Sequence, residues 1–231
     1  MAKSKSKPVF NISGTVLGIT FVNSTAYGKH IRAARGTYTP VEVNEAFKAT
    51  SKQLISANLP AKMIKDAIDP YRTDFIHGML WQRLVSIFRK QYKENGAFDF
   101  KALKDFEIHS EFPLTRLVTF QSTVSFDFLQ SQIMVTLEFE NHPDFKESGV
   151  DGYRVTGIAI HPDLRHKTAA TYQIVLPVIN LKDKVKPLTI AIPQHSDLTL
   201  LCVKLEACSK GEVVNNYATK GMKIIQVIEP G

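Results

Sequence analysis

The sequence predicts an α+β protein that is predominantly β, with an N-terminal β-hairpin, a helical segment and then an antiparallel β-sandwich or jelly-roll-like body. Three observations support this fold class. Residues 9–34 alternate between apolar and polar side chains and are punctuated by glycine. Apolar residues then recur near a 3.6-residue period until about residue 95. From about residue 107 onward, short strand-like segments are separated by Pro, Gly, Asn and Asp.

The first segment predicts a small β-hairpin or meander. Residues 9–12 and 15–22 have strand-like patterns, and residues 23–28 have the composition of a turn. Residues 29–34 are then expected to return as the partner strand. Gly14 and Gly18 lie within or beside these strands, where glycine usually marks a bulge or a close approach of backbone.

The next segment, from Glu42 to about Asn95, predicts three helices. Thr39 and Pro40 form a plausible start signal, and Pro60 and Pro70 suggest two further helix starts, because the first turn of a helix does not need the missing proline N–H. The last helix has the clearest apolar face, formed by Leu80, Trp81, Leu84, Ile87 and Phe88. Gly96 is expected to end this helix as a left-handed cap.

The remaining chain predicts a β body. The expected strands span residues 114–120, 124–128, 132–140, 153–160, 172–179, 188–192, 198–207 and 222–228. Within residues 132–140 the alternation places Glu138 and Glu140 on a polar, solvent-facing side, opposite a uniformly apolar one. We therefore expect three parts: a basic arm (1–8), a hairpin with helices (9–105) and a β-sandwich-like domain (106–231).

The positive charge of the chain is concentrated toward its start. Net charge is +7. Residues 1–105 hold 17 Lys or Arg against 8 Asp or Glu, whereas residues 106–231 hold 12 against 14. The candidate partner-binding residues are those that precede the first acidic residue, namely Lys3, Lys5, Lys7, Lys29, Arg32 and Arg35. Such a region commonly meets nucleic acid or an acidic protein surface, and the alternative is a solubilising tail.

Composition also predicts a cytoplasmic protein without a membrane span. The longest apolar runs are far shorter than the roughly 20 residues needed to cross a bilayer, and the lysine-rich start is followed by strand-like sequence instead of a signal-peptide core. Cys202 and Cys208 fall in one predicted strand, about 20 Å apart, so a disulfide between them is excluded. Free thiols fit a reducing compartment.

The sequence contains three candidates for a catalytic or metal-binding motif. The spacing of His161, Asp163 and His166 could present ligands to zinc, but Pro162-Asp163 is also ordinary turn chemistry, which we favour. Residues 195–197 are His, Ser and Asp, but consecutive side chains cannot adopt triad geometry. Glu138 and Glu140 are explained by solvent exposure. We therefore expect no catalytic residue, metal, cofactor or small-molecule substrate.

One segment resembles a known group of sequences. The run Ile12-Ser13-Gly14-Thr15-Val16-Leu17-Gly18-Ile19-Thr20-Phe21, followed by Gly28-Lys29, Arg32, Phe47 and Thr50, resembles the opening of a family of uncharacterised proteins from Bacteroidetes and their mobile elements. The resemblance covers about the first 50 residues and brings no catalytic residue with it. The absence of catalytic motifs predicts a non-enzymatic structural or protein-interaction protein. The mobile-element context of the family that it resembles implies a component of a phage-like particle or another assembly, located in the cytoplasm or a virion. The alternatives are a non-specific nucleic-acid-binding protein that uses the basic N-terminal region and an enzyme whose site forms only in three dimensions.

Overall fold

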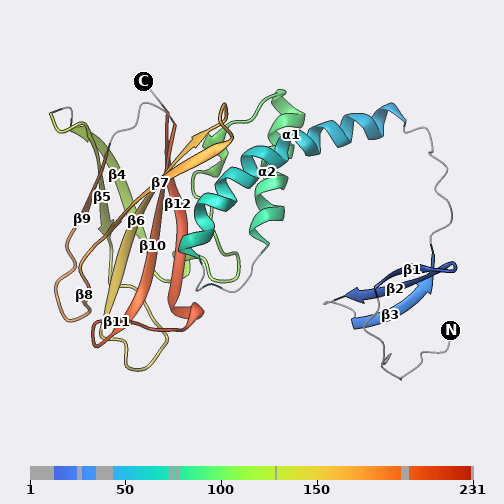
Figure 1. The fold of residues 1–231 in the computed structure, drawn as a ribbon. Helices are drawn as coiled ribbons and strands as arrows, with labels where there is room; N and C mark the ends of the chain where they lie inside the picture. The colour runs from blue at the N-terminus through green and yellow to red at the C-terminus, as the bar shows by residue number, and fades with distance from the viewer. Residues whose placement is uncertain are drawn as a thin grey trace. The chain divides into compact units, whose positions relative to one another are not determined.

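The computed structural model describes residues 13–24, 28–34, 44–72, 75, 79–127, 129–193 and 198–229. It divides the chain after Phe47 into two compact units, an N-terminal unit and a body (Figure 1). The boundaries expected after residues 8 and 105 do not coincide with this division. The body contains both the helices and the sandwich strands.

The N-terminal unit contains a three-stranded antiparallel sheet in the order β1-β2-β3. Its strands are β1 (Gly14–Val16), β2 (Ile19–Ser24) and β3 (Gly28–Ala33). The expected return strand is confirmed as β3, but the expectation of one strand over residues 15–22 is wrong. Leu17 and Gly18 have φ values of 48° and 78° and form a two-residue turn between β1 and β2. The strand expected at residues 9–12 lies outside the described residues.

Two α-helices precede the sheets of the body, α1 (Glu45–Ile68), whose first residues lie before the unit boundary, and α2 (Leu80–Asn95). The 3-10 helix η1 (Asp69–Tyr71) follows α1. The expected helix start at Pro60 is wrong, because α1 continues through this residue. Pro60 is buried in a row with Ala57, Ala61 and Ile64, so packing on this face outweighs the lost backbone hydrogen bond. The expected left-handed cap of α2 is confirmed: Gly96 has φ 71°.

Two antiparallel sheets form the rest of the body. The large sheet has the order β11-β10-β6-β7, with β12 also paired to β10 and β8 to β6. Its strands are β6 (Gly152–Asp163), β7 (Thr168–Val175), β8 (Ile179–Asn180), β10 (Thr199–Ser209), β11 (Glu212–Val213) and β12 (Lys220–Ile228). The small sheet has the order β4-β5-β9, with β4 (Phe120–Asp127), β5 (Gln132–Phe139) and β9 (Leu188–Pro193).

Short 3-10 helices connect these elements: η2 (Phe100–Leu103), η3 (Leu114–Arg116) and η4 (Tyr217–Thr219). The strand expected over residues 114–120 is therefore wrong in its first part. Pro113 stands before the 3-10 turn, and Glu107 accepts hydrogen bonds from the backbone N–H groups of Leu114 (2.7 Å) and Thr115 (3.2 Å). These contacts stabilise the turn, and strand structure begins only at Phe120.

The large sheet is the middle layer of the body. Along β10, Leu200 and Cys202 pack in one hydrophobic cluster with α1 and α2, whereas Leu201 and Val203 pack in a second cluster with the small sheet. Figure 1 shows the helices beside β12 and β10, and β4, β5 and β9 on the other side. This arrangement confirms a predominantly β, α+β fold, and it explains why β6 and β10 are buried along almost their whole length.

Candidate interaction surfaces

The structure separates the two described residues of the predicted basic site. Lys29 and Arg32 both lie exposed on β3, where they are opposite Asn23 and Thr20 of β2. Because successive side chains of a strand point to opposite faces, residues three apart lie on different faces of the sheet. Lys3, Lys5, Lys7 and Arg35 lie outside the described residues.

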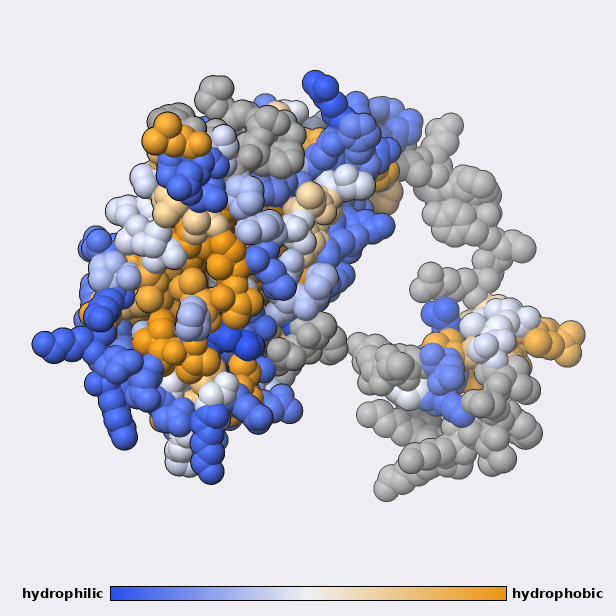
Figure 2. Space-filling model, turned by 60° about the vertical axis from the view of Figure 1, so that its left-hand side comes forward, coloured by the Kyte–Doolittle hydropathy of each residue, from blue (hydrophilic) through white to orange (hydrophobic). Residues whose placement is uncertain are grey.

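One face of the N-terminal sheet is apolar. The strand register places Val16 opposite Ile19, Ile19 opposite Ala33 and Phe21 opposite Ile31, so all five side chains share this face. We call it the apolar face. The side chains of Ile19 and Ile31 are 44% and 56% exposed, and no strand residue of this sheet with a described side chain is buried. Apolar residues of this unit are visible at its surface in Figure 2.

The opposite face of the same sheet is mainly polar. Thr15 and Thr20 share a hydrogen bond of 2.9 Å between their hydroxyl groups, and His30 and Arg32 follow on β3. Val22 is the apolar residue on this side. The sheet is therefore amphipathic, with a cation on each face.

An ionic cluster around a buried carboxylate lies in the large sheet, and the sequence analysis does not identify it. The carboxylate of Glu206 on β10, 2% exposed, accepts hydrogen bonds from Lys204 Nζ and Arg154 Nη2, both at 2.9 Å. The Lys204 ammonium also lies 5.7 Å from the centre of the Phe75 ring. Ion pairing and hydrogen bonding compensate the cost of burying these charges. The two-residue spacing of Lys204 and Glu206 in an apolar strand was the available signal.

The residues expected at the His161 loop do not form a metal site. His161 is buried in β6, with its ring Nδ1 2.9 Å from Thr199 Oγ1, whereas Asp163 and His166 form an exposed pair at 2.5 Å. The hydrogen bond between them raises the pKa of His166 and lowers that of Asp163. Within the described residues no group of three metal-ligating side chains exists. The turn lies at residues 164–167, slightly later than expected.

The other residues singled out in the sequence do not come together in one site. Cys202 and Cys208 are buried free thiols on β10, as expected, and burial raises the pKa of both. Glu138 is exposed on β5, also as expected. Residues 195–197 lie outside the described residues.

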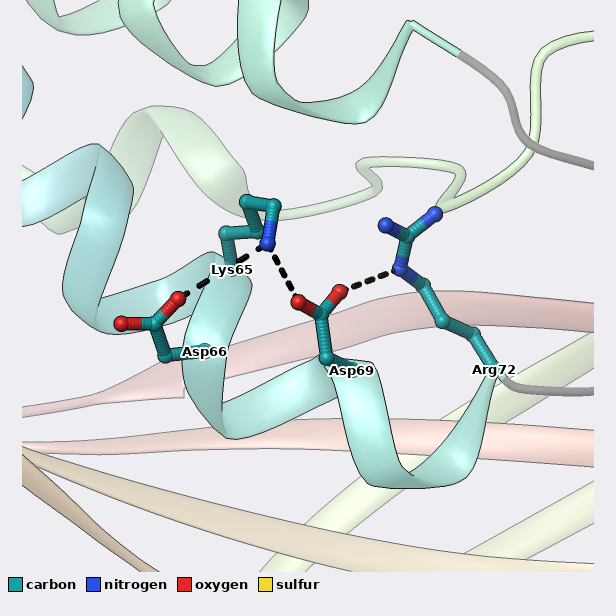
Figure 3. Close-up of polar contacts among 4 residues, drawn as sticks. All are labelled: Lys65, Asp66, Asp69 and Arg72. Carbon is teal, nitrogen blue, oxygen red and sulfur yellow. Dashed lines mark hydrogen bonds and ion pairs between the residues drawn. The ribbon is translucent and has the colours of Figure 1, made fainter.

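A groove of about 500 Å³ lies between α1 and β7. Its walls include Met63 and Ala67 from α1 and Ala169 from β7, and its charged side chains are Lys62, Lys167 and the acidic Asp66. At the end of α1, Lys65 contacts both Asp66 and Asp69, and Arg72 Nε lies 2.6 Å from Asp69 Oδ1 (Figure 3).

These polar contacts fix the end of the helix. Partial burial alone would raise the pKa of Asp69, but the hydrogen bonds from Lys65 and Arg72 outweigh it and hold this pKa below its ordinary value. Lys65 is therefore engaged beside the groove, whereas no described acidic side chain forms an ion pair with Lys62 or Lys167.

Comparisons with known proteins do not assign a family. No protein-family model matches the sequence, and a search of curated proteins finds no match. Among the described helices, none has the length and hydrophobicity needed to cross a membrane.

Proposed function

We propose that this chain is a non-enzymatic structural or protein-interaction protein that assembles through the apolar face of its N-terminal sheet. The observation that carries the proposal is the exposure of Val16, Ile19 and Ile31 on one face of a three-stranded sheet. A small sheet gains stability when its apolar face is covered, because burial of apolar area is its main favourable term. A second copy of the chain offers the same face in the symmetric way that homodimers use.

The resemblance of the first 50 residues to mobile-element proteins gives this proposal its most concrete form. The chain would be a component of a phage-like particle or of another assembly, located in the cytoplasm or a virion. The buried ionic pairs, the buried thiols and the isolated Asp163–His166 pair offer no nucleophile and base in contact, which agrees with an interaction role.

The proposal is tested by weakening the apolar face without changing charge. The double variant Ile19→Thr, Ile31→Thr keeps β-branched side chains and removes apolar surface from this face. Sedimentation velocity on the full chain should show multimers at tens of micromolar for the wild type and association at least about tenfold weaker for the variant. The matched control, Val22→Thr, makes a similar change on the opposite face and should associate as the wild type does. A wild type that stays monomeric, or equal effects of both changes, would contradict self-assembly.

The second candidate function is non-specific nucleic-acid binding, for which Lys29 and Arg32 present one exposed cation on each face of the N-terminal sheet. Contacts to phosphates make affinity fall steeply with salt. The variant Lys29→Glu, Arg32→Glu should then abolish binding of fluorescently labelled duplex DNA at low salt, as measured by anisotropy. The variant Ile19→Thr, Ile31→Thr should still bind this DNA. DNA binding that does not change between about 50 and 200 mM salt would refute this alternative.

A further inference from the structure

The two edge strands of the large sheet, β12 and β7, differ in whether other backbone covers them. On one side, the segment before η3 covers β12: Ile108 N–H donates to Met222 O and Ile224 N–H donates to Phe106 O, both at 2.9 Å, with a bridge between Glu107 and Lys223. On the other side is β7, which pairs with β6 and with no other described strand. One edge is therefore covered and the other is open in the part of the chain that the structure describes.

The register shows which backbone groups of β7 face outward. The N–H of Leu176 donates to Val155 O. In an antiparallel pair the backbone groups of every second residue point toward the partner strand, so counting back from Leu176 gives the residues of β7 whose N–H and C=O groups face β6. The outward-facing N–H and C=O groups belong to the intervening residues Ala169, Thr171, Gln173 and Val175. Four donors and four acceptors thus line the open edge.

The sequence of β7 lacks the features that usually protect an edge. The strand reads Thr-Ala-Ala-Thr-Tyr-Gln-Ile-Val, without a charged residue, a proline or a glycine. Its side chains Tyr172 and Val175 are exposed, as is Val178 just beyond it. Such a strand is a template on which another extended segment can pair.

The groove between α1 and β7 lies beside the first half of this edge. A strand paired with β7 would place alternate side chains toward Met63, Ala67 and Ala169, which accept small apolar groups. Lys62 and Lys167 line the same groove, and Arg165 lies in the turn before β7. Asp66 also lines this groove, but its carboxylate pairs with Lys65, so Lys62, Lys167 and Arg165 leave an excess of positive charge. This charge favours an acidic residue at the end of the guest strand that meets Thr168.

We propose that the open edge of β7 binds an extended peptide segment of a partner protein, with small apolar residues at alternate positions and an acidic end. The guest runs antiparallel to β7, as all pairs in this sheet do, so its acidic end is its carboxyl-terminal one. Pairing of β7 with the β7 of a second copy is disfavoured. Because β7 carries no charged residue, it would bring no acidic side chain to the turn that contains Arg165 and Lys167. The surface belongs to the body and does not depend on the function proposed for the N-terminal sheet.

The test uses the full chain and a fluorescein-labelled peptide, Thr-Val-Thr-Val-Thr-Val-Asp-Asp, followed by anisotropy. Saturable binding is expected, and the same peptide ending in Lys-Lys should bind at least about fivefold more weakly. Hydrogen exchange should slow at Ala169, Thr171, Gln173 and Val175 when the peptide binds, because its carbonyl groups accept from their N–H groups.

Two variants test the site itself. Gln173→Pro removes an outward N–H that β6 does not use, and should weaken binding at least about tenfold. The matched control is Ser122→Pro. Ser122 is exposed on the edge strand β4, and its N–H points away from β5, so this variant should leave peptide binding unchanged. Lys62→Glu should weaken binding about fivefold, whereas Lys52→Glu, exposed on the same helix, should not.

Several results would overturn the proposal. The first is the absence of saturable peptide binding up to about millimolar peptide. The second is an equal loss of peptide affinity in Gln173→Pro and Ser122→Pro. The third is slowed hydrogen exchange at amides outside β7 instead of within it. If Gln173→Pro instead abolishes a dimer of the free protein, a second copy covers the edge and the partner peptide is refuted. Ile19→Thr, Ile31→Thr should retain peptide binding, so failure of the N-terminal proposal is distinguishable from failure of this one.

Discussion

Gly157 in β6 provides a quantitative test of how the two sheets pack. A Cβ atom at this position would lie 2.8 Å from Cγ2 and 2.9 Å from Cδ1 of Ile190 on β9. Carbon atoms in contact prefer a separation of about 3.5–4.0 Å, so Gly157→Ala creates an overlap of at least about 0.6 Å. We expect this variant to lower the free energy of unfolding by about 1–3 kcal/mol, as overpacked cores do. Urea unfolding followed by circular dichroism measures it.

The overlap should be relieved by shortening the neighbour. Ile190→Ala alone creates a cavity and should cost about 2–5 kcal/mol, because this side chain is buried. In the double variant both clashing atoms are gone, so its cost should be smaller than the sum of the two single costs by about 1–3 kcal/mol.

Gly221 and Leu114 form a second pair, in which shortening the neighbouring side chain should not relieve the overlap. A Cβ there would lie 2.7 Å from the Cα of Leu114, a backbone atom that Leu114→Ala leaves in place. Gly221→Ala should therefore destabilise the body, and Leu114→Ala should not rescue it. Additive effects at Gly157 and Ile190, or equal rescue in the two pairs, would refute this account of the packing.

Two further predictions concern the helices. Leu84 of α2 is fully buried in the cluster shared with the large sheet, so Leu84→Ala should cost about 2–5 kcal/mol in a single unfolding transition; separate helix and sheet transitions in a thermal melt would show that they do not share a core. The pKa of Asp69 is lowered by Lys65 and Arg72, so its contribution is present above the ordinary value of 3.8 and is lost as the pH falls through the folded-state pKa. Asp69→Asn should therefore destabilise by up to about 1 kcal/mol at pH 7, discounted for exposure, and by progressively less as the pH falls below 3.8; a difference in urea midpoint that grows on acidification would contradict this.

For a strand with one buried face, the side chains that point to the core could be predicted from the sequence. In β5, Ile133, Val135 and Leu137 are buried and their neighbours are not, as the alternation indicated. Pro60 was misinterpreted because local preference disfavours proline within a helix, whereas burial of this face decides the outcome. Leu17 was missed because a left-handed φ is uncommon for leucine, so the pattern suggested an uninterrupted strand.

The candidate surfaces depend on information that alternation does not contain. The amphipathic pattern of β2 indicates that Ile19 and Phe21 share a face, but it does not say whether that face is covered. The contact between Arg154 and Glu206 joins residues 52 positions apart and requires the pairing of β6 with β10. The open edge of β7 likewise follows from strand order, which short apolar segments do not specify.

The central position of the large sheet also sets the order in which the body can fold during synthesis. Ile64 of α1 packs in one cluster with Cys202 of β10, which follows it by 138 positions in the sequence. At about 5–20 residues per second, the apolar side of α1 leaves the ribosome roughly 7–30 seconds before β10. Residues of α2 and β6 that share the cluster emerge in between. Until β10 is made, the cluster lacks this strand and part of its apolar surface stays exposed, so the yield of folded protein should depend on chaperone supply and on translation speed.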